Sequence, residues 1–234
     1  RATSNTKYLD KLHVHIESVL ANRDDKIGRK DYKGELVPSW GTNRFTRNGE
    51  WMDFAVCTGM ITYPMLEFVQ LVRESEVRKY SFVADNVLQE VEKAIGYHNK
   101  DWNIGHYVYP EDFYHEDNYI LPLSQQAAIA RSLLLLYELT GRQEYLNKAS
   151  SIAQLIKISL KYDSKGYILG IFPGKITKKN SIADISHSTI TIHFAYLSYK
   201  NKIIFDEEDM RGFTRTIKNL AKPNNNHFPK YLDG

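Results

Sequence analysis

Residues 120–160 contain two helical patterns of different kinds, joined by one tight turn. The first, over residues 122–139, is apolar almost all round and includes four consecutive leucines at 133–136. A helix without a polar face must be buried on every side. The second, over residues 145–160, carries its apolar residues on a single stripe and so has one solvated face. A buried helix followed by a half-buried helix indicates an inner and an outer layer of helices.

The same order of patterns recurs in the chain. An apolar segment at 60–72 precedes a one-sided stripe at 80–95, and an apolar segment at 185–199 precedes a stripe at 206–220. The repeating unit is about 60 residues long, although the units share little sequence. An opening helix at 6–20 also has one apolar stripe and is expected in the outer layer. The pattern predicts an all-α fold, an (α/α)n toroid of about three helical hairpins plus a leading helix.

Residues typical of helix ends agree with these boundaries. Gly141 follows the last periodic residues of the helix at 122–139, where a left-handed C-cap favours glycine. Asp206, with Asp209 three residues later, has the character of an N-cap. Pro122 suits the first turn of a helix. Pro64 leaves two alternatives open: either the first inner helix begins near Thr62, or a longer helix kinks at the proline.

Composition indicates an ordinary folded core, with 42% hydrophobic and 25% charged residues. No linker or low-complexity tract divides the sequence, so we expect residues 1–234 to form a single domain, part of a longer chain. The net charge of +3 is too small to favour nucleic acid as a partner. No apolar run is long and uncharged enough to predict membrane insertion. The single cysteine, Cys57, is expected to be a buried, inert side chain.

The connection at 97–119 is rich in aromatic, histidine and acidic residues. A connection of this length without its own secondary structure is usually functional or disordered, and its aromatic content argues against disorder. Flat rings pack on the apolar faces of sugars, while amides, acids and imidazoles bind the hydroxyls. The candidates from this segment are Tyr97, His98, Asn99, Trp102 and Tyr109. The alternative interpretation is a packed loop that closes the bottom of the helix ring.

Residues 37–53 form a second candidate segment, directly before the first inner helix. Arg44 or Arg47 would clamp a carboxylate in bidentate fashion. The alternative is a surface arginine beside a structural tryptophan. The candidates for substrate binding in this segment are Trp40, Asn43, Arg44, Trp51 and Asp53.

The third candidate segment contains Asp184 and His187, at the first turn of an apolar helix. The positive end of a helix disfavours imidazolium, so His187 is expected to be neutral and able to act as a base or a hydrogen-bond donor. His193 lies six residues later, far round the helix, and is not expected to share this site. A lone histidine on an apolar helix is otherwise a core residue.

Polar residues also open and interrupt the most apolar helix. Gln125 and Gln126 lie at its start, where they would cap the backbone or point into a central cavity. Arg131 lies inside the apolar run, and a buried arginine needs a carboxylate partner. Because no acid lies four residues away on the same helix, that partner is expected from another element.

The run QQAA…LLLLYELTG…YL, beginning at Gln125, resembles the inner–outer hairpins of helical-toroid carbohydrate-active proteins. That group includes six-hairpin glycosidases, alginate and glucuronan lyases, and the helical domain of glucuronyl epimerases. Residues 40–64 and 184–187 most resemble the lyases that act on uronate polysaccharides. A full ring in these families has more hairpins than this chain supplies, so an open or partial ring is expected. The resemblance implies a secreted or periplasmic protein whose partner is a polysaccharide or oligosaccharide.

A uronate lyase abstracts the proton next to the sugar carboxylate and must stabilise the charge that develops. Asn99, Gln125 or Arg44 would neutralise the carboxylate. His187 or a tyrosine would be the base, and Tyr97 or Tyr109 the acid. No cofactor is implied, and the histidines at 98, 106 and 115 lack the spacing of a metal site.

Two other functions stay open at this point. A glycoside hydrolase would need two carboxyl groups on either side of the scissile bond. The available acids are Asp53, Asp101, Glu111, Asp112 and Asp184. The third possibility is a glycan-binding protein without catalytic activity, because fold alone does not fix function.

Overall fold

The computed structural model describes residues 6–44, 46, 48–75, 78–110, 119–164, 166–173, 182–220 and 230–231. Over these residues the protein is all-α, as predicted. The helices are α1 (Lys7–Ala21), α2 (Asp24–Ile27), α3 (Ala55–Glu74), α4 (Ser81–Tyr97), α5 (Leu123–Thr140), α6 (Gln143–Ser159), α7 (Ile185–Lys200) and α8 (Glu207–Leu220). Two 3-10 turns, η1 (Arg78–Tyr80) and η2 (His98–Asp101), and two antiparallel hairpins, β1 (Trp102–Asn103) with β2 (His106–Tyr107) and β3 (Lys161–Asp163) with β4 (Gly166–Ile168), complete the described elements.

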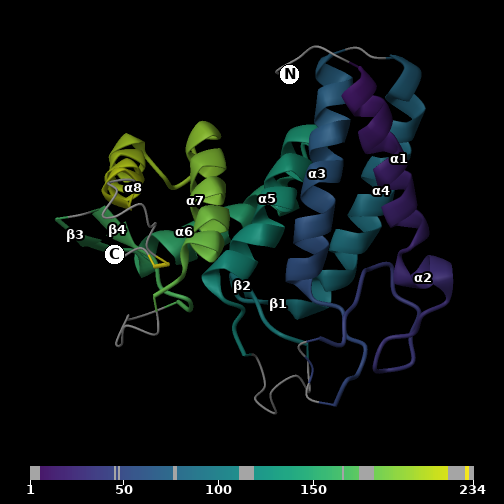
Figure 1. Ribbon diagram of the computed structural model, residues 1–234, viewed down its shortest axis with the longest axis horizontal. Helices are drawn as coiled ribbons and strands as arrows, with labels where there is room; N and C mark the ends of the chain where they lie inside the picture. Colours follow the sequence, from purple (N-terminus) through teal and green to yellow (C-terminus); the bar gives the residue numbers. More distant parts are fainter. Residues whose placement is uncertain are drawn as a thin grey trace.

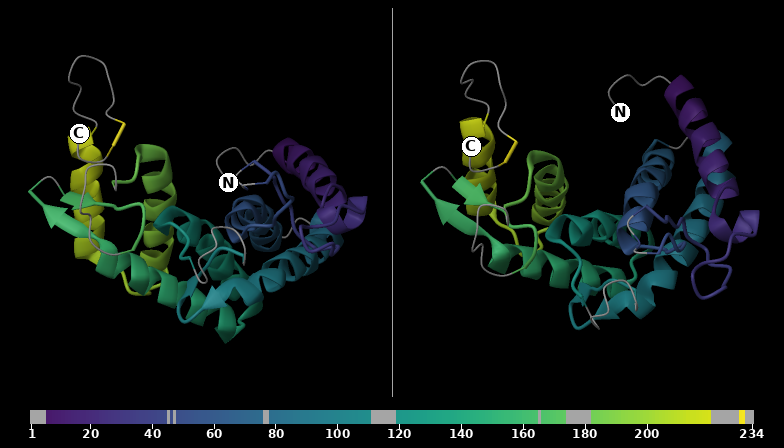
Figure 2. Two further views of the ribbon diagram at one scale, coloured as in Figure 1. Left: turned by 90° about the horizontal axis from the view of Figure 1, so that it is seen from below. Right: turned by 60° about the horizontal axis from the view of Figure 1, so that its bottom comes forward.

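The helices follow an open arc (Figures 1 and 2). Helix α5 packs between α3 and α7, and these three helices form one row along the arc. Helix α4 packs on α3, and α6 packs on α5, so that these two row helices are each followed in sequence by a helix that covers them from outside. We call the side of the arc that α3, α5 and α7 share its concave face.

Helix α5 is buried as the sequence predicts. Every residue from 126 to 136 is buried, and Leu133, Leu134 and Leu136 are at most 1% exposed. Helix α6 buries only one stripe, which includes Tyr145, Ile152 and Ile156. The difference between the two patterns therefore corresponds to a central helix and a covering helix.

Helix α7 is less buried than its apolar sequence indicates, and that prediction was wrong. One face, which includes Thr191 and Phe194, is buried against the rest of the chain. On the other side Tyr196 is 48% exposed, and His187 is exposed as well. The reason is that α7 packs along α5 on one side and makes few contacts with α8.

Helix α3 is continuous from Ala55 to Glu74 and contains Pro64. Of the two alternatives for the proline, the structure has the longer helix. Pro64 is exposed, so the backbone on that side of the helix is open to water. By length and mean hydropathy alone α3 could cross a membrane, although the helix contains the charged residues Glu67, Arg73 and Glu74, and 56% of that stretch is buried inside the protein.

The predicted helix ends at Gly141 and Asp206 are confirmed, whereas Pro122 is the N-cap of α5 and does not belong to its first turn. Gly141 has a left-handed φ of 71° and donates its N–H to the Tyr137 carbonyl at 2.8 Å, which closes α5. At the start of α8, the Asp206 and Asp209 side chains accept reciprocally from each other's backbone N–H groups, at 3.0 and 2.8 Å. Lys157 from α6 pairs with Asp209 at 2.8 Å and so ties α6 to α8.

The contact between α3 and α5 depends on a glycine. A Cβ atom on Gly59 would lie 2.5 Å from the Cα and N atoms of Ile129. The Ser132 hydroxyl donates to the Gly59 carbonyl at 3.2 Å and lies 2.9 Å from the Thr62 hydroxyl. The two helices therefore approach so closely that backbone meets backbone, with small polar side chains satisfied between them.

We predict that Gly59→Ala destabilises the protein by about 1–3 kcal/mol, because the added methyl group has no space without moving a helix. The matched control is Gly96→Ala in the last turn of α4, where a Cβ atom would meet nothing within 4 Å. There alanine should stabilise by up to about 1 kcal/mol through helix propensity. Urea unfolding of both variants measures the difference. Equal stability of the two variants would contradict the close approach.

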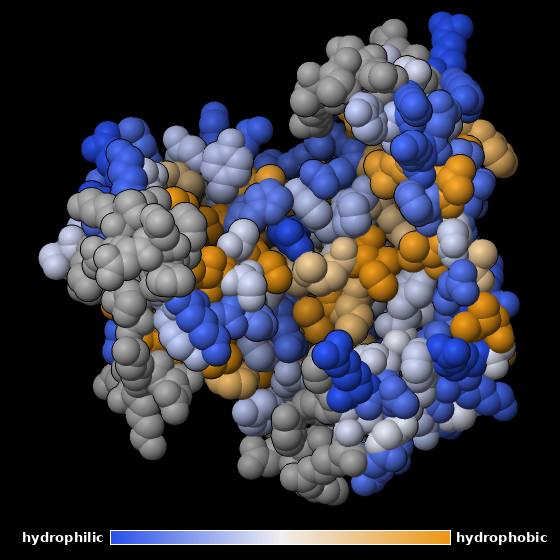
Figure 3. All heavy atoms as spheres, in the orientation of Figure 1, coloured by the Kyte–Doolittle hydropathy of each residue, from blue (hydrophilic) through white to orange (hydrophobic). Residues whose placement is uncertain are grey.

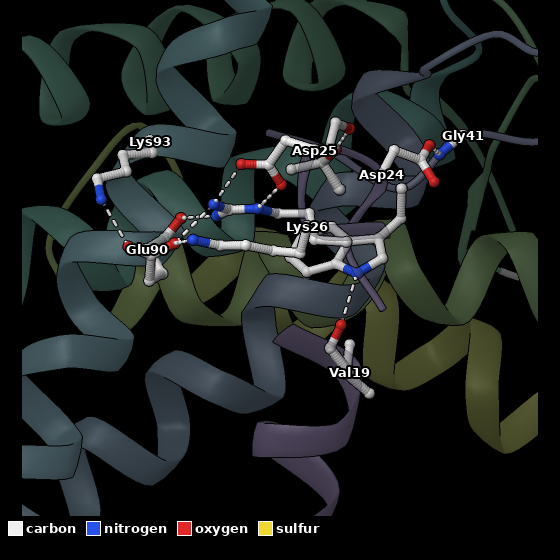
Figure 4. A network of polar contacts seen from close by, with 11 residues as sticks. Val19, Asp24, Asp25, Lys26, Gly41, Glu90 and Lys93 are labelled. Carbon is white, nitrogen blue, oxygen red and sulfur yellow. Dashed lines mark hydrogen bonds and ion pairs between the residues drawn. The ribbon is translucent and has the colours of Figure 1, made fainter. Parts of the chain in front are cut away.

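A buried arginine, Arg23, joins the start of α2 to α4. Figure 4 shows its two acidic partners, Asp25 and Glu90. Arg23 is 1% exposed, and its guanidinium pairs with Asp25 at 2.7 Å and with Glu90 at 2.6 Å. It also donates to the Glu90 carbonyl at 3.1 Å. Lys93 pairs with the other oxygen of Glu90 at the surface. The network fixes the segment that leads from α1 toward the first candidate loop.

Removal of the arginine should leave two carboxylates without their buried partner. We predict that Arg23→Met lowers the free energy of unfolding by about 3–5 kcal/mol. Lys93→Met removes an exposed partner of the same Glu90 and should cost less than about 1 kcal/mol. Chemical denaturation measures the loss of unfolding free energy in each variant. A similar small loss for both would show that the buried network contributes little to stability.

Candidate functional site

A cavity of about 640 Å³ lies where α3, α5 and α7 begin. Its walls are mostly apolar, with Phe54, Val56, Met60, Ile61 and Ile190. Four polar side chains also line it: Tyr109, Ser124, Gln125 and His187. In the space-filling view the middle of this face is hollowed and holds an apolar patch bordered by hydrophilic atoms (Figure 3). An apolar hollow with a few convergent polar groups is the usual form of a ligand site.

A smaller cavity of about 190 Å³ adjoins the first. It shares Ser124, Gln125 and His187 with the larger cavity and adds Asp184 and Tyr231. The three shared residues therefore lie at the junction of one continuous site, formed by the first turns of α5 and α7.

Asp184 positions His187. The carboxylate caps α7 by accepting from the His187 N–H at 2.9 Å, and both of its oxygens lie 2.9 Å from His187 Nδ1. The hydrogen bond from the His187 backbone and that from Ser186 hold the pKa of Asp184 well below its usual range. An ionised carboxylate against Nδ1 fixes the imidazole tautomer with its proton on Nδ1. Among the described residues, Nε2 has no hydrogen-bond partner and is left for a ligand.

The two predicted glutamines have different surroundings. Gln125 lines both cavities, and its buried Oε1 has no hydrogen-bond partner in the described part of the chain. Gln126 is fully buried and bonds both backbone groups of Tyr107, at 2.9 and 2.7 Å. Gln125 is thus available to a ligand, whereas Gln126 anchors the β1–β2 hairpin to α5.

One aromatic residue of the connection between α4 and α5 lines the cavity. Tyr109 stacks on Tyr119 with ring centroids 5.8 Å apart and meets Phe54 edge-on at 6.0 Å. Trp102 packs instead on Tyr107 at 5.0 Å, under the ammonium group of Lys148. Residues 111–118, with two of the candidate acids, lie outside the described residues.

The remaining candidates of this connection lie away from the cavity. The Tyr97 hydroxyl accepts from Lys100 at 2.7 Å and lies 3.5 Å from Asp31, and burial raises its pKa. Asn99 is exposed and accepts from Lys148. Instead of a loop throughout, this part of the chain forms the end of α4, η2 and a hairpin. We therefore do not assign Tyr97 or Asn99 to the site.

The residues of the segment before α3 support the fold. Trp40 is buried, and its indole N–H donates to the Val19 carbonyl at 2.9 Å. Trp51 donates to Asp24 at 2.6 Å beneath the guanidinium of Arg29. The structure thus does not bring the tryptophans to the cavity. Asn43 and Arg44 are exposed and do not line it either, and Arg47 lies outside the described residues.

Behind the cavity lies a buried polar chain that the sequence did not indicate. His98, which is 0% exposed, bonds Asp101 through Nδ1 at 2.8 Å and Thr58 through Nε2 at 2.8 Å. The Thr58 hydroxyl lies 2.9 Å from Ser39. These groups satisfy one another and join η2 to the first turn of α3. His98 is therefore a support of the cavity wall and has no access to a ligand in this structure.

Asp53 ends the same segment and is 3% exposed. Burial raises the pKa of Asp53 to about 7, with the charges of Asp24 and Asp31 adding to the effect and Ser39 opposing it. Neighbouring Cys57 lines the cavity and is half-buried, so the prediction of a fully buried thiol was wrong. Burial and the charge of Asp53 raise the pKa of Cys57 to about 11, which keeps the thiol protonated at neutral pH.

The raised pKa of Asp53 makes stability depend on pH. In the unfolded chain the carboxyl ionises near pH 4, whereas in the folded protein it stays protonated up to about pH 7. Between these values the native state loses about 1.4 kcal/mol per pH unit relative to the unfolded chain. We predict that Asp53→Asn removes this loss and is more stable than the wild type at pH 8, by a larger margin than at pH 5.

Asp25 provides the control of opposite sign. Its pKa is lowered by its hydrogen bond and charge contact with Arg23, although burial opposes this effect. Its stabilisation is therefore present above its ordinary pKa and is lost as the pH falls. Asp25→Asn should cost more stability at pH 8 than in acid. Urea unfolding of both variants from pH 4 to pH 8 measures the two trends, and parallel trends would contradict the assignment for Asp53.

A pair of carboxyl groups does not line the cavity in the part of the chain that the structure describes. Asp184 is the acid at its edge, and its oxygens bind His187. Asp53 and Asp101 are buried behind the wall, while Glu111 and Asp112 lie outside the described ranges. Among the described residues no group of three or more potential metal ligands is present.

Comparisons with protein-family models, with curated proteins and with solved structures found no match for this chain. The fold and site therefore define a class in physical terms alone. The protein is an open arc of α-helices with an apolar cavity. A glutamine, Gln125, and a histidine bound by a carboxylate, His187, line this cavity.

Proposed function

We propose that the protein acts on a uronate-containing polysaccharide and cleaves it by β-elimination, with His187 as the base. The observation that supports this proposal is the Asp184–His187 pair at the junction of the two cavities. Because the Asp184 carboxylate binds Nδ1, Nε2 is the ring nitrogen that faces a ligand and can accept a proton from it. In β-elimination a base abstracts the proton next to the sugar carboxylate, and a single histidine can supply that base. A glycoside hydrolase instead needs two carboxyl groups that flank the scissile bond.

The other roles follow from position in the cavity. Gln125 is suited to bind the sugar carboxylate by donating from its side-chain NH₂ group, next to the positive ends of α5 and α7. Tyr109 lies on the wall formed by the loop before α5 and is our candidate for the acid that protonates the leaving oxygen. The apolar wall would carry the faces of the sugar rings. Arg44 and Asn99, the other candidates for carboxylate binding, do not line the cavity.

The proposed fold family is the (α/α)n toroid of carbohydrate-active proteins. An arc in which α3, α5 and α7 form the concave row, covered by α4 and α6, is compatible with part of such a ring. Since a polymer of this kind is degraded outside the cytoplasm, secretion or a periplasmic localisation belongs to the same proposal.

The test is incubation with glucuronan, alginate and related polymers, followed by ultraviolet absorbance of the unsaturated uronate that β-elimination creates. We predict that His187→Ala lowers kcat/KM by about 10²–10⁴-fold, as expected for loss of a general base. The matched control is His15→Gln, because His15 is exposed on α1 and has no place in the cavity. Its activity should equal that of the wild type.

The products separate the alternatives. New reducing ends without the unsaturated chromophore would identify a hydrolase and contradict the proposal. Binding of oligosaccharides without either product would identify a glycan-binding protein. Full activity of His187→Ala would remove His187 from the mechanism.

A further inference from the structure

The inference concerns Arg131, in the middle of the buried helix α5. Arg131 is only 8% exposed, yet its contacts within the described residues are with His193, Met60 and Tyr63, and none of them is an ion pair with a carboxylate. The expectation of a carboxylate partner from another element was therefore wrong. Glu67 contributes an attractive charge but forms no ion pair with it. A buried cation without an anion is costly, and such an exception calls for an explanation.

The contacts of this guanidinium come from both neighbouring helices. Its plane lies over the Tyr63 ring of α3 at 4.6 Å, one Nη atom is 3.2 Å from Met60 Sδ, and the other is 3.3 Å from His193 Nδ1 of α7. A ring face, a thioether and a neutral imidazole are weak acceptors beside a cation. Arg131 Nε, which is buried, has no partner among the described residues. The guanidinium thus has more N–H donors than its described neighbours have acceptors.

The imidazole of His193 adds a second donor to the same place. Burial and the adjacent guanidinium lower the pKa of His193, which favours the neutral ring. Because Nδ1 faces Arg131 as an acceptor, the proton of the neutral ring is on Nε2. Arg131 and His193 together therefore present N–H donors with no described carboxylate to receive them. A planar carboxylate matches this arrangement better than a neutral hydroxyl does.

The cluster lies next to the cavity that holds His187. Met60 belongs to both, since it lines the cavity and contacts the guanidinium. Ser124 and Arg131 are seven residues apart on the same face of α5, which separates them by about 10 Å along the helix. A ligand that reaches from the cavity to Arg131 is therefore longer than one sugar ring.

We propose that Arg131, with Tyr63 and His193, forms a second binding position on the concave face, which takes a carboxylate of an acidic oligosaccharide whose other end occupies the His187 cavity. The inference rests on the proposed function for the nature of its ligand. It assigns to Arg131 a binding role that does not include the chemical step.

The test measures binding in the full chain with His187→Ala, so that turnover does not interfere. Calorimetry compares an oligoglucuronate with a neutral oligoglucoside of the same linkage and length. We predict that addition of Arg131→Met weakens binding of the acidic oligomer by about 10- to 100-fold, the loss expected for a charge-assisted hydrogen bond, and leaves the neutral oligomer unaffected. Arg131→Lys should weaken binding of the acidic oligomer by an intermediate factor, because lysine keeps the charge but lacks the paired N–H donors that bind both carboxylate oxygens.

Arg142→Met is the matched control, because Arg142 is 55% exposed and pairs with Glu92 at 2.9 Å away from the cavity. Its binding should be unchanged. The unfolding temperature of Arg131→Met should equal or exceed that of the parent, because a buried unpaired charge is removed. Equal weakening for both oligomers, no weakening, or no binding of the acidic oligomer by the parent would overturn the inference. Failure of the β-elimination assay would leave this binding result intact, so the two proposals fail separately.

Discussion

The close approach of α3 and α5 at Gly59 is the constraint on which the arrangement of the site depends. The backbone of Ile129 occupies the space that any side chain at residue 59 would need. This contact sets Met60 of α3 beside the first turns of α5, where Ser124 and Gln125 line the cavity. It also brings Met60 and Tyr63 against Arg131. Both proposed binding positions thus derive from one crossing of two helices.

Electrostatics then distinguishes the residues that support the cavity from those available to a ligand. Asp101, His98 and Thr58 satisfy one another in the interior, and Arg23 is held by two acids. Burial of such a network lowers stability little when all its groups are paired. Removal of one member leaves a buried group without its partner and destabilises the protein strongly. His187, Gln125 and Arg131 differ, because within the described residues Asp184 binds His187 through Nδ1 alone, while Gln125 Oε1 and Arg131 Nε lack hydrogen-bond partners. They all belong to helices of the concave row.

Periodicity in the sequence predicted the helices and their order but only part of the site. The leucines of α5 and the ends marked by Gly141 and Asp206 depend on local spacing and were predicted correctly. Long-range contacts decided the rest. Trp40 faces the core because the Val19 carbonyl lies within hydrogen-bond distance, and nothing near Trp40 in the sequence indicates this. For Arg131 the sequence predicted an ion pair with a carboxylate. Its actual neighbours are a tyrosine, a methionine and a histidine from other helices, which the sequence cannot show.

The exposure of α7 was missed for a similar reason. Its sequence is apolar enough for an inner helix, yet its burial depends on how many neighbours the arc provides. His187 was identified correctly as a first-turn residue, because a preceding Asp184 is a local signal for an N-cap. Its place in a cavity with Gln125 and Tyr109 depends on contacts between elements more than 60 residues apart.

The central claim is that an acidic polysaccharide binds the concave face where α3, α5 and α7 begin. Amide hydrogen exchange of the His187→Ala protein, with and without an oligoglucuronate, tests this most directly. The account predicts slower exchange in the first turns of these three helices and in the residues around Tyr109, with α1 and the exposed side of α6 unchanged. Protection confined to α1, α6 or α8, or no protection at saturating oligomer, would contradict it.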